Sequence, residues 1–280
     1  MVIRLAARGS HQLSRVLRSP HWITTPGSSK PVQASLERTW SYSTETSNGS
    51  GSKEADATPR KNHWTDGKVR EVLEAQNQKL WIQGVKDRLK THHLPEETKT
   101  KVVELLQLRV SELIEKHNGR VSDERSSTHL QTAALVLATH KVLLPFLRNE
   151  EEVLTIIKGQ MGAATSPMLR YMLKGTLYLS SDPFKSMARR LHSLKSDLGA
   201  AVTADITESE QSAMMEVSSC LYNDMFEAEE LPQLTSCCCC SVDRMWFEGL
   251  ERFGVGFSFP KRLSEGDGKC CFKLNRIPKA

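Results

Sequence analysis

The chain has 280 residues, of which 39% are hydrophobic and 25% are charged, a composition typical of a globular protein with one or two domains. The best apolar run, residues 133–138, is far shorter than the roughly 18 residues of a membrane span, which excludes an integral membrane protein. Residues 1–42 hold six of the 38 basic residues and one of the 33 acidic residues, so they account for the whole net charge of +5. Because the remaining chain is neutral, we expect no nucleic-acid partner and no membrane partner.

The first 42 residues have the composition of an organellar targeting sequence. They are rich in Arg, Ser and Thr, nearly free of acidic residues, and able to form a short basic amphipathic helix. They lack the continuous apolar segment of a secretory signal. Arg38 stands two residues before Trp40, and Ser41 follows, an arrangement that resembles a mitochondrial processing site. We therefore predict a mitochondrial transit peptide at residues 1–42 and a location in the mitochondrial matrix, with the chloroplast as the alternative.

Two regions of different character follow the targeting sequence. Residues 43–62 consist mainly of Ser, Thr, Gly, Asn and charged residues and are predicted to be a disordered linker, since they have nothing to bury. The region 63–197 is predicted to be helical, because its apolar residues recur at helical spacing and Gly is scarce. The spacing and the N-cap residues predict six helices, at about 69–89, 95–117, 123–147, 150–161, 167–179 and 183–195.

The third of these helices is the most apolar and is expected to be central. Pro145 near its end is expected to bend or terminate it. His129 and His140 fall on one face of the helix. At such positions we expect buried or hydrogen-bonded imidazoles rather than catalytic ones.

The region 198–280 contains short alternating segments of the kind that form strands. Residues 200–206 and 214–218 flank a polar turn and predict one hairpin. Residues 253–259 and 269–274 flank a turn at 265–268 and predict a second. Between the hairpins, residues 222–230 and about 232–250 are predicted to be helical. The sequence therefore predicts an α+β fold, in which an N-terminal helical region packs on a C-terminal antiparallel sheet of two hairpins with inserted helices.

All seven cysteines follow residue 219, and four of them are adjacent at positions 237–240. An odd number with this spacing is a poor disulfide framework, so we expect reduced thiols, most of them packed as small apolar side chains. We expect no bound metal, because there is no Cys-x-x-Cys and adjacent helical side chains point about 100° apart; a structural zinc site is the alternative. Cys220, Cys240 and Cys270 differ from the rest, because two strands and the helix between them can gather these thiols around Asp243.

An ordered set of motifs in this region resembles a known family. In chain order the motifs are Val217-Ser-Ser-Cys220-Leu-Tyr222, Phe226, Glu230-Leu231, Cys240-Ser-Val-Asp243 and Leu263-Ser-Glu-Gly266-Asp267-Gly-Lys-Cys270-Cys-Phe272. They match the pattern of the L-2-amino-thiazoline-4-carboxylic acid hydrolase family, in which a strand ends in Cys and an aromatic residue, a helix carries C-x-x-D, and a closing strand carries G-D-x-x-C-x-F. The similarity covers about residues 125–275.

The resemblance implies a hydrolase that opens a cyclic amidine of the 2-aminothiazoline-4-carboxylate type to an N-carbamoyl-cysteine-type product. A carboxylate suits the role of general base for the attacking water, and Asp243 is the candidate. Cys240 or Cys270 is the candidate nucleophile, and Cys220 would line the same site. The partner is then a small-molecule substrate, no cofactor is implied, and the oligomeric state is open. The candidate substrate-binding residues are Tyr222, Arg262, Gly266 and Asp267.

Departures from the family pattern bear on the substrate. Cys271 stands where family members usually carry an acid, and Arg262 is a shifted substitute for a strand arginine that would bind the substrate carboxylate. The pair Gly266-Asp267 also fits a simple tight turn. The alternative function is a non-catalytic small-molecule-binding or assembly protein on the same scaffold. The spacing Gly266-x-x-x-Cys270-x-Phe272 is similar to that of vinyl-reductase-type ligand-binding domains, which supports this alternative.

Overall fold

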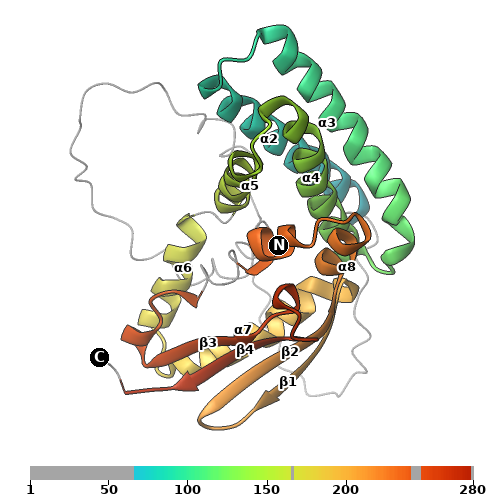
Figure 1. The fold of residues 1–280 in the computed structure, drawn as a ribbon. Helices are drawn as coiled ribbons and strands as arrows, with labels where there is room; N and C mark the ends of the chain where they lie inside the picture. The colour runs from blue at the N-terminus through green and yellow to red at the C-terminus, as the bar shows by residue number, and fades with distance from the viewer. Residues whose placement is uncertain (1–65, 165–166, 241–246, 279–280) are drawn as a thin grey trace, which may run out of the picture.

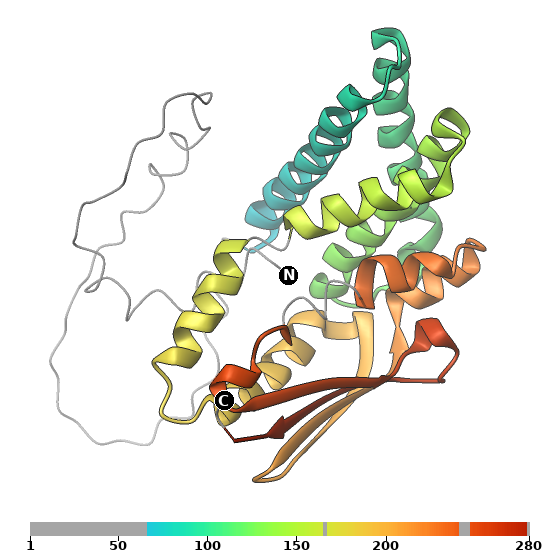
Figure 2. The same ribbon diagram turned by 60° about the vertical axis from the view of Figure 1, so that its left-hand side comes forward.

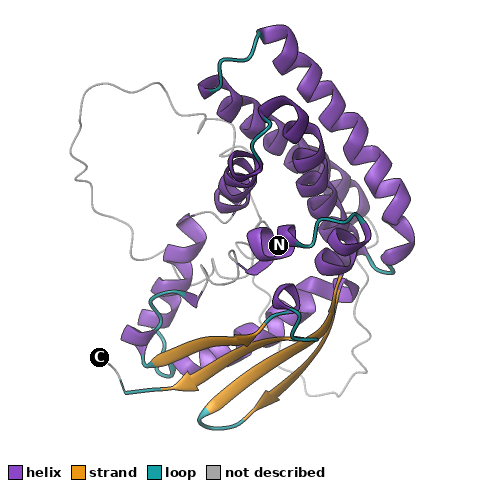
Figure 3. Cartoon of the chain, viewed as in Figure 1, coloured by secondary structure: helices purple, strands orange, loops and turns teal. Residues whose placement is uncertain are grey.

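The structure is a computed structural model that describes residues 66–164, 167–240 and 247–278 (Figure 1). The predicted transit peptide and linker, at residues 1–62, lie outside the described residues. The described chain combines a helical region with a four-stranded antiparallel sheet, which confirms the α+β class (Figure 3). The main elements are α2 (Asp66–Arg88), α3 (Glu96–His117), α4 (Glu124–Leu147), α5 (Glu150–Ala164), α6 (Pro167–Tyr178), α7 (Pro183–Leu198), β1 (Val202–Glu208), β2 (Ser212–Cys220), α8 (Leu221–Ala228), α9 (Gln233–Thr235), β3 (Val255–Lys261) and β4 (Cys270–Arg276).

Helix α4 is capped by Asp123, whose carboxylate makes two backbone contacts. One oxygen accepts a hydrogen bond from the N–H of Ser126 at 2.6 Å, and the other accepts one from the N–H of Ala200 at 2.7 Å. The cap therefore also joins the start of α4 to the segment that leads into β1. Pro145 lies inside the helix, which ends two residues later at Leu147, so the proline stands in its last turn.

By length and composition, α4 is the one helix in the described ranges that is long and apolar enough to cross a membrane. Of its most apolar 18-residue window, 61% is buried inside the protein. This burial is what the central helix of a folded core shows, and it explains why the helix is apolar on nearly every side.

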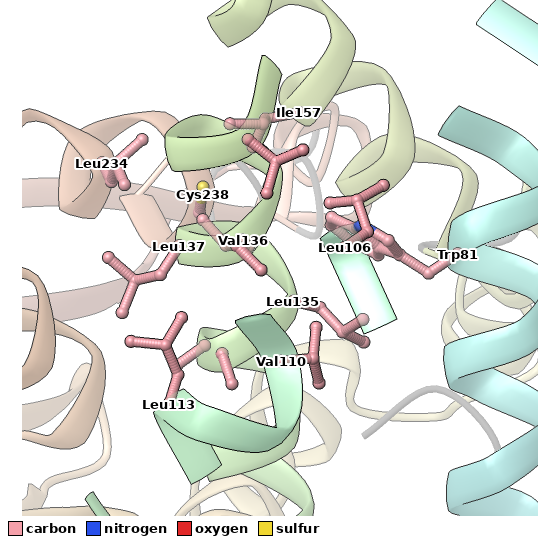
Figure 4. Packing of buried hydrophobic residues seen from close by; sticks show 14 of the residues in the cluster. Trp81, Leu106, Val110, Leu113, Leu135, Val136, Leu137, Ile157, Leu234 and Cys238 are labelled. Atoms are coloured by element: carbon pink, nitrogen blue, oxygen red, sulfur yellow. The ribbon is translucent and has the colours of Figure 1, made fainter. Parts of the chain in front are cut away.

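The first hydrophobic core, here called the helical core, forms around α4 (Figure 4). Residues 135–137 of α4 lie among side chains of α2, α3 and α5, including Trp81 and Ile157. Leu234 and Cys238, which follow β2 by more than ten residues, pack on the same helix. The helical core is thus completed by residues from the C-terminal third of the chain.

The second hydrophobic core, here called the sheet core, lies between the sheet and helices α6 and α7. The strand order is β1-β2-β4-β3, so the two predicted hairpins join through the antiparallel pair β2–β4. In that pair Met215 faces Phe272 and Val217 faces Cys270, and all four side chains are buried. Helix α7 lies along this face of the sheet (Figures 1 and 2). One covered face is the common arrangement for an antiparallel sheet.

The elements of each core are not consecutive along the chain. Helices α6 and α7 pack on the sheet, whereas α8, α9 and the following π-helical turn η6 (Ser236–Cys240) pack on the helical core. The junction between β2 and α8 therefore passes from one core to the other. The helix predicted at about 232–250 is observed as α9 and η6, and residues 241–246 lie outside the described part of the chain.

Candidate functional site

Three of the predicted motif segments meet at one end of the sheet. Cys270 is the first residue of β4 and pairs with Val217 of β2, and Cys220, the last residue of β2, lies three residues after Val217. Both cysteines belong to or pack against the sheet core. The turn η6 contacts η8 (Leu263–Glu265), the short 3-10 segment that leads toward β4 (Figure 2). The cysteine-containing turn therefore lies next to the segment that leads into β4.

The sulfur of Cys270 accepts a hydrogen bond from a backbone amide. The N–H of Leu263 points at Sγ of Cys270 with an N···S distance of 3.3 Å, and the cysteine is 8% exposed. The contact places a backbone hydrogen-bond donor on this sulfur at the edge of the sheet core.

The structure describes less of Cys240 and Asp243, the other members of the predicted catalytic group. Cys240 ends η6, and its side chain is outside the described part of the structure. Asp243 lies within residues 241–246, which are also outside it. Cys237 and Cys238 are buried in the helical core, which confirms a packing role for these two. All five described cysteines are thiols, namely Cys220, Cys237, Cys238, Cys270 and Cys271.

Tyr222, a predicted substrate-binding residue, is held by a histidine from α4. Its hydroxyl lies 2.9 Å from Nδ1 of His129, and the two rings meet edge to face. His129 is 5% exposed, and burial lowers its pKa to about 4, so the imidazole is neutral at physiological pH. His140 is also buried and lies 3.3 Å from Oε1 of Glu150. Both histidines are hydrogen-bonded interior residues, as predicted.

The loop between β3 and β4 contains the remaining predicted residues, and their contacts are within the loop. The carboxylate of Asp267 accepts a hydrogen bond from the N–H of Arg262 at 2.8 Å. Gly266 has a φ of 85°, a left-handed conformation that favours glycine. The guanidinium of Arg262 pairs with Glu265 and lies 5.0 Å from the ring centre of Phe259. Gly266 and Asp267 form the tight turn that was the simpler interpretation of their sequence.

Cys271, which replaces an acid of the family pattern, lies on the other face of the sheet from Cys270. Its thiol donates to Oε1 of Glu216, the residue opposite it on β2, with an S···O distance of 3.4 Å. Burial and the adjacent carboxylate of Glu216 raise the pKa of the Cys271 thiol. The carboxylate of Glu216, on the neighbouring strand β2, therefore lies beside the position where the family pattern carries an acid.

In the described ranges, no group of three or more His, Cys, Asp or Glu side chains is arranged to hold a metal ion. A buried charged group does occur at the end of α8. Glu229, whose side chain is 4% exposed, contacts Lys116 at 2.7 Å, Lys141 at 2.6 Å and His117 at 2.8 Å. Burial alone would raise the pKa of Glu229, but the hydrogen bonds from these three residues lower it to about 2. Because Lys116, His117 and Lys141 lie far from Glu229 in the sequence, no local sequence pattern predicts this network.

Comparison with known families agrees with the motifs. The model of the L-2-amino-thiazoline-4-carboxylic acid hydrolase family matches residues 128–274, which is more than half of the chain. Among curated proteins, none matches the sequence. The matched segment begins one residue before His129 and ends within β4, so it includes most of α4, the sheet core and the two strand-end cysteines. The chain belongs to the L-2-amino-thiazoline-4-carboxylic acid hydrolase family.

Proposed function

We propose that the chain hydrolyses a cyclic amidine or thiazoline of the 2-aminothiazoline-4-carboxylate type and releases an N-carbamoyl-cysteine-type product. Family membership supports a hydrolase-like function. The observation that carries the proposal further is the thiol of Cys270, which receives a backbone hydrogen bond at the sheet end that it shares with Cys220. A cysteine sulfur beside a backbone donor is a group that can attack the electrophilic ring carbon.

The proposed reaction joins one water molecule to the ring and breaks one bond. The electrophile is the ring carbon between the sulfur and two nitrogens. Water loses a proton to a general base and attacks this carbon, which gives a tetrahedral intermediate. The intermediate expels the ring sulfur as a thiolate, which takes up a proton. The carbon becomes the carbonyl of a urea, so the product carries a carbamoyl group on nitrogen and a new thiol.

The chain offers two routes for the attack. In the first, Asp243 takes the proton from water, and the thiols polarise the ring. In the second, the thiolate of Cys270 or Cys240 attacks the ring carbon and expels the ring thiolate, and water then hydrolyses the enzyme-bound isothiourea. The N–H of Leu263 supports the second route for Cys270, because it donates a hydrogen bond to the sulfur that would attack. Cys220 lines the same end of the sheet.

A pair of adjacent cysteines tests the assignment. Cys270→Ser in the full chain should lower turnover of 2-aminothiazoline-4-carboxylate on the order of 10²-fold or more, because a hydroxyl is a poor substitute for a thiolate. Cys271→Ser is the matched control, since this thiol lies on the other face of the sheet and contacts Glu216. Its turnover should stay close to that of the wild type. Equal rates for all three proteins would remove Cys270 from the mechanism, and binding without turnover by the wild type would favour the non-catalytic alternative.

A further inference from the structure

Helix α6 carries large apolar side chains on two opposite faces. Leu173 and Leu177 pack inward, in the sheet core. On the outward face, Tyr171 is 76% exposed, Tyr178 is 82% exposed and Leu179 is 71% exposed. The helix lies at the edge of the described part of the molecule (Figures 1 and 2). A helix at such an edge normally turns a polar face to water, so the outward face of α6 has the composition of a surface that a partner covers.

Gly175 lies at the centre of this outward face. The N–H of Leu179 donates to the carbonyl of Gly175 at 3.1 Å, so the helical geometry continues to Leu179. At about 100° per residue, Tyr171 and Leu179 then lie about 40° to either side of Gly175, and Tyr178 lies about 60° away. Gly175 is exposed, and a Cβ added to it would meet no atom within 4 Å. The backbone is therefore accessible at the middle of the face, between large side chains.

We infer that this outward face, here called the α6 patch, is an interface at which two copies of the chain pack across a two-fold axis. A two-fold interface must be self-complementary, because the same patch of each copy faces the other. The α6 patch meets this requirement around Gly175. When α6 packs antiparallel to its copy with the two glycines opposite each other, Tyr171 of one copy lies beside Tyr178 and Leu179 of the other. The inference does not depend on the proposed function.

The area of the α6 patch fits a second copy of the chain. A standard interface buries about 800 Å² on each partner, and a little over half of this area, about 450 Å², is apolar. At the exposures of Tyr171 and Tyr178, the two tyrosines alone present roughly 250–400 Å², to which Leu179 adds. The exposed residues of this face are all uncharged, as in the depleted core of an interface: Tyr171, Gly175, Thr176, Tyr178 and Leu179.

Sedimentation velocity of the full chain, from about 1 to 100 µM, tests the inference. The wild type should form a dimer in this range. Gly175→Gln should give a monomer, because the added side chain separates the two helix backbones. Its fold should be intact, since the position is open and Gln favours a helix more than Gly does. Tyr178→Glu should raise the Kd of the dimer by about 30-fold or more, the effect of losing a tyrosine at the centre of an interface.

Leu108→Glu is the matched control, because Leu108 is an exposed leucine on a different helix, α3. It should leave the Kd of the dimer unchanged, which separates a specific contact of α6 from general surface stickiness. The Tm of each variant shows that it is folded, and Tyr178→Glu decides alone if Gly175→Gln does not fold. A wild type that stays monomeric over the whole range overturns the inference and leaves the α6 patch to a different partner. A dimer of wild-type affinity in folded Gly175→Gln or in Tyr178→Glu overturns it as well, because the copies would then meet elsewhere.

Discussion

Cysteine side chains occupy different chemical environments in the described chain, although the sequence groups them together. Cys237 and Cys238 fill space in the helical core, whereas Cys270 accepts a backbone N–H at the end of the sheet. Cys271, one residue further, faces Glu216 on the opposite side. The alternation of side chains along β4 is sufficient to explain the contrast between the last two. Position in the fold, rather than cysteine content, therefore determines the neighbours of each thiol.

The buried imidazole of His129 predicts a pH dependence of stability. Its pKa is lowered from 6.5 to about 4 in the folded chain, because burial disfavours the charged ring; Asp123 and the backbone of Asp197 oppose this shift. The unfolded chain therefore takes up a proton at a higher pH than the folded chain. The contribution of His129 to the free energy of unfolding is therefore complete above pH 6.5. It is lost as the pH falls toward 4, by roughly 3 kcal/mol at most.

Urea unfolding at pH 7.5 and pH 5 measures this dependence. The wild type should lose more stability between the two values than His129→Phe does. His192→Phe is the control, because that histidine has an exposed side chain and should leave the wild-type dependence intact. The same pH dependence in His129→Phe as in the wild type would contradict a neutral, buried His129.

At the scale of the elements, the C-terminal end of α8 is attached to α3 and α4 by the network of Glu229. Glu229→Gln weakens the hydrogen bonds from Lys116 and Lys141, whose side chains still reach solvent, so it should cost about 1–3 kcal/mol, the range for hydrogen bonds to a charged group. Glu230→Gln, the neighbouring exposed residue, should change stability by less than about 0.5 kcal/mol. Chemical denaturation of both variants checks the difference. Similar losses of stability in Glu229→Gln and Glu230→Gln would show that the network does not anchor α8.

Most elements were predictable because their signals are local. Apolar spacing and N-cap residues predict the helices, and Asp182 does cap α7 by accepting from the N–H of Lys185. The predicted strands β1 and β3 begin two residues too early, at 200 and 253. The reason is that Gly199–Ala201 and Glu251–Phe253 form 3-10 turns, which alternation of apolar residues does not reveal.

The long-range contacts were not predictable in the same way. The pairing of β2 with β4 and the network of Glu229 join residues that lie dozens of positions apart. The sequence indicated Tyr222 as a substrate-binding residue, but its partner His129 lies 93 positions away. The motifs predict Cys220 at a strand end and Cys270 on the last strand, and the structure places both residues there. For Arg262 and Asp267, only the structure shows that the loop uses both residues for its own geometry.

On the scale of the whole molecule, the matched family segment contains the sheet core and most of α4, whereas α2, α3 and the start of α4 precede it. These first helices pack on α4 and enlarge the helical core. The candidate site lies where β2 passes into α8, between the two cores. The Asp123 contacts with Ser126 and Ala200 join α4 of the helical core to the segment that leads into the sheet.

The region before the described chain carries a separate prediction. We propose that residues 1–42 direct the protein to the mitochondrial matrix and are removed near residues 40–42, because the basic, acid-poor segment ends there. A fluorescent reporter fused to residues 1–60 should enter mitochondria and appear shortened by the cleaved segment. Replacing Arg4, Arg8, Arg15 and Arg18 with Gln is the control and should abolish import. An intact fusion protein that stays in the cytosol would contradict the proposal.

Ring opening is the central claim, and product formation tests it most directly. The full chain is incubated with 2-aminothiazoline-4-carboxylate, and N-carbamoyl-cysteine is followed by mass spectrometry for the wild type and for Asp243→Asn. The account predicts product from the wild type and a rate lower by roughly 10²–10⁴-fold for Asp243→Asn, with a nearly unchanged Tm. The absence of product from a folded wild-type chain that binds the compound would contradict the claim and favour a binding protein on this scaffold.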